Sequence, residues 1–145
     1  MPPAGKHYVA LLQGVLAGGA RTVDAPLLRR ETGERRVVVD AAGKPAQTHF
    51  TPRRRFRDAT LTDVRLGTGR THQVRVHAAY LGHPLAGDER YGDPKATGAW
   101  KQRGLTRLFL HAARLSFPHP ATGQTVDVES PLPKDLARVL ESLDA

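Results

Sequence analysis

Short runs of apolar and β-branched residues, separated by turn residues, recur along the chain and predict strands. Two of these runs are separated only by residues 41–45, whose composition (Ala-Ala-Gly-Lys-Pro) is typical of a turn. We therefore expect the two flanking runs, residues 35–40 and 47–50, to pair as a hairpin. The complete set of predicted strands is residues 8–15, 35–40, 47–50, 59–66, 108–117 and 125–129.

Two segments have the spacing of amphipathic helices. Within residues 72–81, Val74, Ala78 and Leu81 occur at i, i+4 and i+7, and Thr71 can cap the start. The second helix is predicted near the C-terminus from Leu136, Val139, Leu140 and Leu143.

The remaining segments are expected to be loops. Residues 21–34 follow the flexible stretch 17–20, and residues 87–104 contain four glycines and Pro94. Several strands and two helices that do not alternate as βαβ units predict an α+β fold with a largely antiparallel, mixed sheet and short helices.

Composition favours one domain with a polyanionic partner. The chain has 145 residues, and 22 Lys and Arg against 14 Asp and Glu give a formal charge of +8. Nucleic acid is the simplest partner of such a charge. No apolar run approaches the ~20 residues that span a bilayer, and no signal-peptide pattern is present. The absence of cysteine excludes disulfides and thiolate metal sites. We therefore expect a cytoplasmic protein without a membrane partner.

The most polar predicted helix follows a Gly-Thr-Gly turn at residues 67–69. Taken alone, its Arg and His residues fit an ordinary solvated helix as well as a functional one. His72 and His77 are five residues apart, which misses the i, i+4 spacing of a helical metal pair, so no metal site is predicted. The Gly67-x-Gly69 pair is too short for a dinucleotide-binding fingerprint.

Several segments, in order, carry a resemblance to a known family. These are Lys-His-Tyr-Val-Ala at 6–10, Gly-Lys-Pro-Ala-Gln-Thr at 43–48, Gly-Arg-Thr-His-Gln-Val-Arg-Val-His at 69–77, Gly-His-Pro-Leu at 82–85, Gly-Asp at 87–88 and Arg-Leu-Phe-Leu-His-Ala-Ala at 107–113. Together they resemble the RluA-type RNA pseudouridine synthases, most closely the synthase C branch that acts on large-subunit ribosomal RNA.

The resemblance implies a reaction and two site residues. In that family an Asp carboxylate starts the isomerisation of uridine, an Arg pairs with that carboxylate, and a Tyr packs on the target base and assists proton removal. By position the Tyr corresponds to Tyr8 and the Arg to Arg75. No redox change occurs, so no cofactor is expected.

One family motif is absent from this sequence. The nucleophilic Asp belongs to His-Arg-Leu-Asp-x-x-Thr-Ser-Gly, which occurs nowhere in the 145 residues. Residues 1–145 are therefore expected to be a partial catalytic domain without its N-terminal half. We expect the chain alone to be inactive and the missing half to lie upstream or to act in trans.

RNA contacts are expected at two places. Arg70 and His72 in the polar segment are candidates for RNA or framework contacts, and Gln73 is a candidate for an RNA contact. Arg53, Arg54 and Arg55 form a basic run that is either an RNA contact or a solvated face. The alternatives to an enzyme part are a non-catalytic RNA-binding module and a basic ribosome-associated structural protein. A His-Arg-Leu-Asp motif encoded directly upstream would distinguish part of an enzyme from a non-catalytic RNA-binding module.

Overall fold

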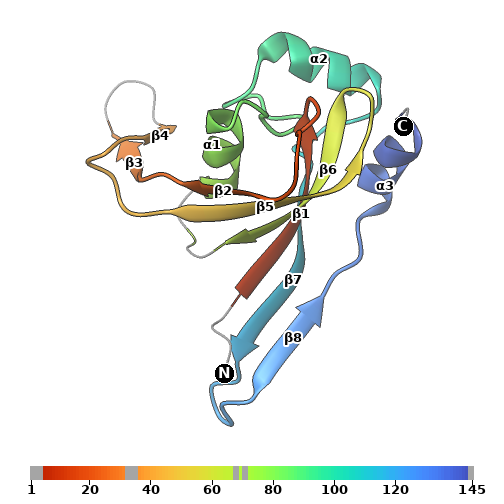
Figure 1. The fold of residues 1–145 in the computed structure, drawn as a ribbon. Coiled ribbons are helices and arrows are strands. Elements are labelled where there is room, and N and C mark those ends of the chain that lie inside the picture. Colours follow the sequence, from red (N-terminus) through yellow and green to blue (C-terminus); the bar gives the residue numbers. More distant parts are fainter. Residues whose placement is uncertain (1–4, 32–35, 67–68, 70–71, 144–145) are drawn as a thin grey trace.

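A computed structural model of the chain describes residues 5–31, 36–66, 69 and 72–143. Its centre is a six-stranded antiparallel sheet in the order β2-β5-β6-β1-β7-β8 (Figure 1). A separate two-stranded sheet pairs β3 with β4. The elements are β1 (Gly5–Gln13), β2 (Arg21–Asp24), β3 (Leu27–Arg30), β4 (Arg36–Val39), β5 (Gln47–Arg55), β6 (Ala59–Leu66), α1 (Gln73–Tyr80), α2 (Pro94–Gln102), β7 (Leu110–Pro118), β8 (Thr125–Glu129) and α3 (Lys134–Glu141).

Strand β1 separates two apolar clusters because successive residues of a strand point to opposite faces. Ala10 and Leu12 pack in a cluster with Val74 of α1. Val9 and Leu11 pack in a second cluster that includes Leu136 of α3. Since both faces of the central strands are covered, buried residues follow one another along β6 without a simple alternation of apolar and polar positions.

The predicted fold class is confirmed, and so are the strands at 59–66 and 125–129. The helix predicted over 72–81 is α1, which begins after His72, a residue with a left-handed φ of 55°. Thr71, the predicted cap, lies outside the described residues. The C-terminal helix is α3, which begins slightly earlier than the apolar spacing suggested.

The hairpin predicted between residues 35–40 and 47–50 is wrong. β4 pairs with β3, whereas β5 pairs with β2 and β6. The intervening chain passes against β3 instead of reversing on itself: Leu27 and Lys44 exchange two backbone hydrogen bonds of 2.9 Å. A Cβ on Gly43 would lie 2.4 Å from the Leu27 carbonyl carbon, so this close passage requires glycine.

Two loop predictions are also wrong. The segment expected to be a loop over 21–34 contains β2 and β3, and the one over 87–104 contains α2. Helix α2 has a clear start: the Asp93 side chain accepts the Lys95 N–H at 3.0 Å, and Pro94 occupies the first turn, where its missing N–H costs nothing.

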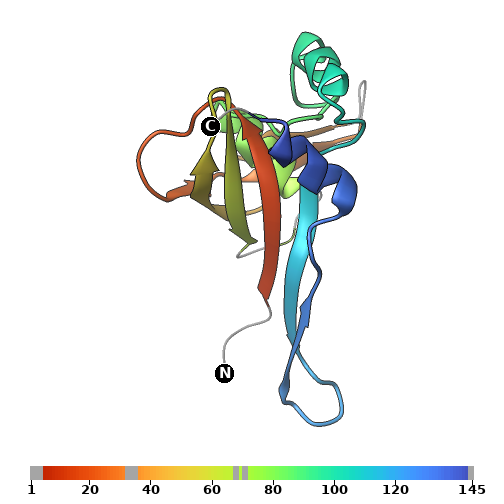
Figure 2. The ribbon, with the colours of Figure 1, turned by 90° about the vertical axis from the view of Figure 1, so that its right-hand side faces the viewer.

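The last two strands, β7 and β8, form an arm that projects from the body of the molecule (Figures 1 and 2). β5 also extends further than predicted, through the basic run to Arg55. No helix among the described residues is long and apolar enough to cross a membrane.

Candidate active site

Arg75 of α1 is held by a carboxylate of the same chain. Its Nε donates to Asp88 Oδ2 at 3.0 Å and its Nη2 to Asp88 Oδ1 at 2.8 Å. The Asp88 side chain is fully buried, and the Arg75 side chain is 20% exposed. Arg75 thus has a carboxylate partner within this chain, and that partner is not the Asp of the absent family motif. A bidentate pair of this kind restrains the guanidinium through two of its three nitrogens.

Backbone groups complete the coordination of Asp88. The N–H groups of Arg90 and Tyr91 each donate to Oδ1 at 3.0 Å. Burial alone would raise the pKa of Asp88, but the hydrogen bonds from Arg75 and these N–H groups outweigh it and place the pKa below its ordinary value. The same pair raises the pKa of Arg75. Both groups therefore stay ionised at neutral pH.

His72 lies directly before α1 in the left-handed region, which is uncommon for residues other than glycine. Its Nδ1 lies 2.8 Å from the Tyr91 hydroxyl oxygen. Burial, followed by the positive charges of Arg75 and Arg90, lowers the pKa of His72. His72 is half-buried, so its predicted contact with RNA stays a prediction.

Gln73 is part of the framework, and its predicted role as an RNA contact is wrong in this structure. Its side chain is 2% exposed, and its Nε2 donates to the Gln47 carbonyl oxygen at 2.8 Å and to Thr48 Oγ1 at 3.0 Å. The Thr48 hydroxyl is in turn 2.7 Å from His77 Nδ1, and His77 Nε2 is 2.9 Å from the Ala25 carbonyl oxygen. A buried amide bonded in this way fixes α1 against β5 and is not accessible to a ligand.

Tyr8 lies in the middle of the sheet, opposite Val64 of β6 and Ala112 of β7. It packs against the same apolar cluster as α1, so Tyr8 and the helix that carries Arg75 lie on the same side of the sheet. Tyr8 also lines a groove of about 1070 Å³, together with Arg53, Arg54 and other residues.

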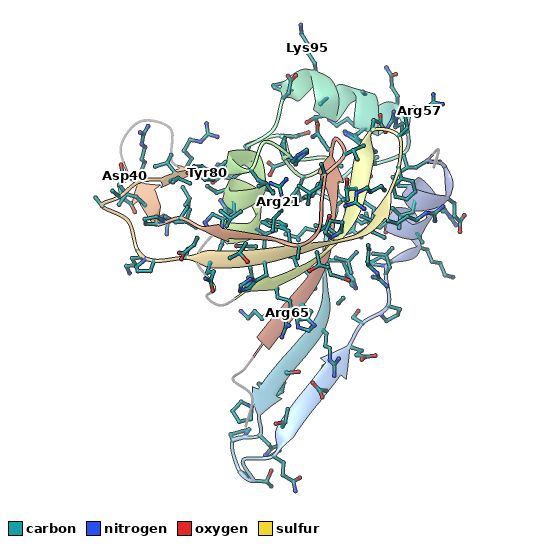
Figure 3. The ribbon with its side chains drawn as sticks, in the orientation of Figure 1. Arg21, Asp40, Arg57, Arg65, Tyr80 and Lys95 are labelled. Atoms are coloured by element: carbon teal, nitrogen blue, oxygen red, sulfur yellow. The ribbon has the colours of Figure 1, made fainter. Side chains whose placement is uncertain are left out.

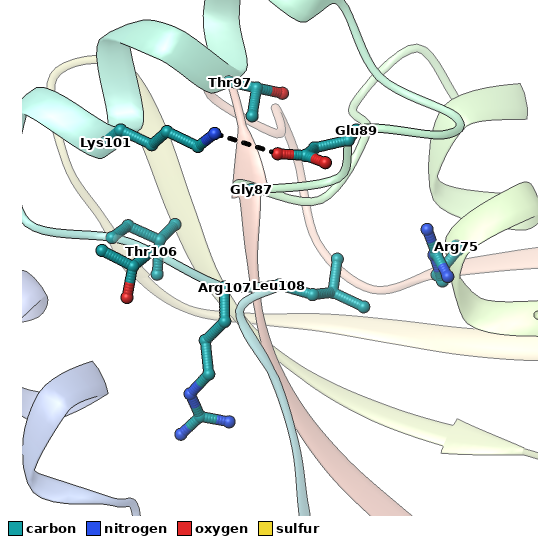
Figure 4. Close-up of a pocket in the computed structure, with 9 residues that line it drawn as sticks. Arg75, Gly87, Glu89, Thr97, Lys101, Thr106, Arg107 and Leu108 are labelled. Atoms are coloured by element: carbon teal, nitrogen blue, oxygen red, sulfur yellow. Dashed lines mark ion pairs between the residues drawn. The ribbon is translucent and has the colours of Figure 1, made fainter.

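Arg75 lines a different and smaller cavity, of about 220 Å³, beside α2 (Figure 4). Three cations surround it, and each is paired: Arg75 with Asp88, Lys101 with Glu89 at 3.1 Å, and Arg107 with Asp135. Leu108 lines this cavity and packs against the same apolar cluster as Tyr8. The described residues thus bring Tyr8 and Arg75 to one side of the sheet but not into one cavity.

The three arginines of the basic run have different environments. Arg53 forms an ion pair with Asp63 at 3.4 Å, and the Arg54 guanidinium lies 4.8 Å from the centre of the Phe56 ring. Arg55 donates to the carbonyl oxygens of Leu16 and Gly18, so it stabilises the loop between β1 and β2. Arg53 and Arg54 remain available on the groove, whereas Arg55 has a structural role that its sequence position did not indicate.

The positive charge is distributed over the molecule. Figure 3 places Arg21, Arg57, Arg65 and Lys95 at separate points of the surface. Arg70, the remaining predicted RNA contact, lies outside the described residues. Within the part of the chain that the structure describes, no group of three or more His, Cys, Asp or Glu side chains could hold a metal ion.

Sequence reasoning missed the partners of Arg75. Asp88 was noted only as part of a motif, and Tyr91 was not singled out. The signal available in the sequence was the adjacent pair Gly87-Asp88, a carboxylate next to a turn residue. In the structure Gly87 has a φ of 82°, and an added Cβ would lie 2.4 Å from the Arg107 carbonyl oxygen, so glycine is required there.

Comparison with known proteins agrees with the resemblance drawn from the motifs. The family model described as RNA pseudouridylate synthase matches residues 4–80. The ribosomal large subunit pseudouridine synthase C of Pasteurella multocida is 45% identical over 140 residues, and that of Escherichia coli K12 is 45% identical over 142 residues; in both cases 95% of this chain is covered. The chain spans 43% and 44% of the length of these two relatives.

Solved structures give the same fold. Human RNA pseudouridylate synthase domain containing 1 matches with a TM-score of 0.79 and 26% identity, over 97% of this chain and 59% of that one. Human RNA pseudouridylate synthase domain containing 4 matches with a TM-score of 0.75 and 24% identity, over 98% of this chain and 64% of that one. The family match, the sequence identity and the shared fold together establish that this chain belongs to the RNA pseudouridylate synthase family.

Proposed function

We propose that this chain is the part of an RNA pseudouridine synthase that supplies the arginine and the tyrosine of the active site, and that large-subunit ribosomal RNA is the substrate. The observation that carries the proposal is the likeness, over 95% of the chain, to relatives named ribosomal large subunit pseudouridine synthase C. In the proposed reaction the glycosidic bond of a uridine breaks, the base rotates, and the base rejoins the sugar through carbon.

The geometry of Arg75 supports a second carboxylate partner. Asp88 occupies Nε and Nη2 of the guanidinium. Among the described residues, Nη1 has no hydrogen-bond partner, and the guanidinium lines an open cavity. A guanidinium has five N–H donors, so Arg75 can hold a nucleophilic carboxylate while it stays bonded to Asp88.

The nucleophile is proposed to come from outside these 145 residues. Asp88 is unsuited to the role because it is buried and both of its oxygens accept hydrogen bonds. The His-Arg-Leu-Asp motif occurs nowhere in the sequence. We therefore infer that residues 1–145 form part of a catalytic domain and that the chain alone is inactive.

The β7–β8 arm offers a surface for the part that carries the nucleophile. Val126 pairs with Phe117, and Val128 lies two residues further along β8 on the same face. Val128 is 51% exposed, and these three side chains belong to none of the core clusters among the described residues. On the opposite face, Arg114 pairs with Asp127 and Glu129, which is typical of a solvated surface.

RNA binding is proposed to rest on the groove and on the excess of positive charge. Arg54 and Arg114 line the groove that also contains Tyr8. Neutralisation of phosphates by such residues releases counterions, so binding should weaken as salt rises. Tyr8 packs with the apolar cluster on the α1 side of the sheet, and a tyrosine ring is suited to stack on an extruded base.

Reconstitution tests the proposal. The purified chain is assayed for pseudouridine in large-subunit ribosomal RNA, alone and after mixing with the part of the E. coli relative that it does not match. We expect activity only in the mixture, and we expect Val128→Lys to weaken the association of the two parts. Activity of the chain alone would refute the missing nucleophile. RNA binding without activity in any mixture would favour a non-catalytic RNA-binding module.

A further inference from the structure

Tyr91 connects three separate parts of the candidate active site. It follows Asp88 by three residues, and its backbone N–H donates to Asp88 Oδ1. Its side chain reaches His72 before α1 and Val37 of β4. Its ring lies near two guanidinium groups, those of Arg36 and Arg75. None of these contacts was anticipated from the sequence.

The hydroxyl of Tyr91 has a defined set of hydrogen bonds. The Val37 N–H donates to it at 3.1 Å, so the oxygen acts as an acceptor toward β4. The hydroxyl proton can then be given to His72 Nδ1, whose distance from the oxygen is 2.8 Å. The two rings meet edge to face, with centres 5.6 Å apart. The hydroxyl therefore ties the β3–β4 hairpin to the start of α1.

The ring of Tyr91 acts on Arg75 from a direction that Asp88 does not cover. The Arg75 Cζ atom lies 5.1 Å from the ring centre and that of Arg36 lies 5.0 Å from it. Both distances are within the range of cation–π attraction. Asp88 restrains the guanidinium through hydrogen bonds to Nε and Nη2, and the Tyr91 ring adds a contact that involves neither of these bonds. The two restraints together leave Nη1 in a fixed place.

We propose that Tyr91 is a positioning residue that holds the Arg75 guanidinium in the orientation needed for a second carboxylate, and that its hydroxyl couples this orientation to the β3–β4 hairpin. The proposal rests on the function proposed above, since it concerns the same arginine. The ring and the hydroxyl have separable roles. Removal of the ring frees the guanidinium, and removal of the hydroxyl alone frees the hairpin and His72.

Nuclear magnetic resonance of the chain alone tests the ring. The rate of hydrogen exchange at Arg75 Nε–H is measured in the wild type, Tyr91→Leu and Tyr91→Phe. We expect the exchange rate to rise about tenfold or more in Tyr91→Leu and to stay within about twofold of the wild type in Tyr91→Phe, which keeps the ring. Tyr80→Leu is the control, because Tyr80 lies on α1 with Arg75 but is 63% exposed. An unchanged rate in Tyr91→Leu would overturn the proposal.

The hydroxyl has its own readout. Tyr91→Phe should increase amide exchange at Val37, whose N–H loses its acceptor, while the wild-type rate is kept at Arg75 Nε–H. If Val37 is unaffected, the coupling to the hairpin is refuted. In the reconstituted enzyme, Tyr91→Leu should lower kcat with little change in KM for RNA. Tyr91→Phe, which keeps the ring, should retain most of the wild-type kcat. If no mixture is active, the proposed function fails, and the exchange rates still decide the role of Tyr91.

Discussion

The buried pair of Arg75 and Asp88 tests how burial changes the contribution of an ion pair to the free energy of unfolding. In Asp88→Asn the carboxylate is replaced by a neutral group of the same shape. Breaking a buried pair by removing one partner costs about 3–5 kcal/mol. The Arg75 side chain is 20% exposed and can gain some hydration, and the new amide oxygen can still accept the two backbone N–H groups. We therefore expect a loss of about 2–3 kcal/mol.

Urea unfolding followed by circular dichroism measures this loss. With a slope of about 1.5–2 kcal/mol per molar for a chain of this size, the midpoint should fall by about 1–2 M. The chain offers a matched control in Asp135→Asn. Asp135 binds Arg107 with the same bidentate geometry, at 2.7 and 3.0 Å, but the two side chains are 54% and 45% exposed. The urea midpoint of Asp135→Asn should hardly differ from that of the wild type, because solvent screens exposed ion pairs.

The pH dependence of stability provides an independent check. The folded pKa of Asp88 lies below its ordinary value, so its contribution is complete above about pH 5 and is lost as the pH falls through about 4 toward the folded pKa. The difference in stability between wild type and Asp88→Asn should therefore shrink in acid. Equal losses in the two variants at neutral pH, or a difference that does not shrink in acid, would refute the argument from burial.

Further outcomes follow from other contacts. Burial lowers the pKa of His77, so wild-type stability should fall as the pH drops below about 6.5, and less steeply in His77→Gln, as measured by urea unfolding at several pH values. Gly87→Ala should cost about 2 kcal/mol or more, whereas Gly123→Ala, with a similar φ of 73° and nothing near the added Cβ, should cost less. Arg54→Gln should weaken RNA binding and reduce its salt dependence, and Arg55→Gln should mainly lower the melting temperature.

The sequence predicted all strands except β2 and β3, and two of the three described helices, because these elements follow from local periodicity. It failed where long-range contacts decide the structure. Strand β4 (Arg36–Val39) pairs with β3 and not with the next run along the chain, and turn composition alone cannot distinguish the two pairings. Helix α2 was missed because the four glycines of residues 87–104 outweighed a start signal that was present, Asp93 followed by Pro94.

The candidate site was predictable only in part. The motif identified Arg75 and Tyr8 through the resemblance to the family, but residue type does not reveal burial. Gln73 looks like a surface residue in sequence, yet its amide is buried between α1 and β5. Its partners lie about 25 residues away in the chain, and neither has a pattern that marks it as a partner.

The polar residues of α1 are bonded within the chain, and this bears on how the active site is assembled. Gln73 and His77 bind β5 and the segment before β3, and Arg75 binds Asp88. A buried polar group that lacks these bonds would be costly, so the position of α1 is fixed without any further protein. The part that we propose to supply the nucleophile therefore does not have to order Arg75. It has only to bring a carboxylate to Nη1 of Arg75. The free energy of its binding does not have to offset the entropy lost in ordering the Arg75 side chain.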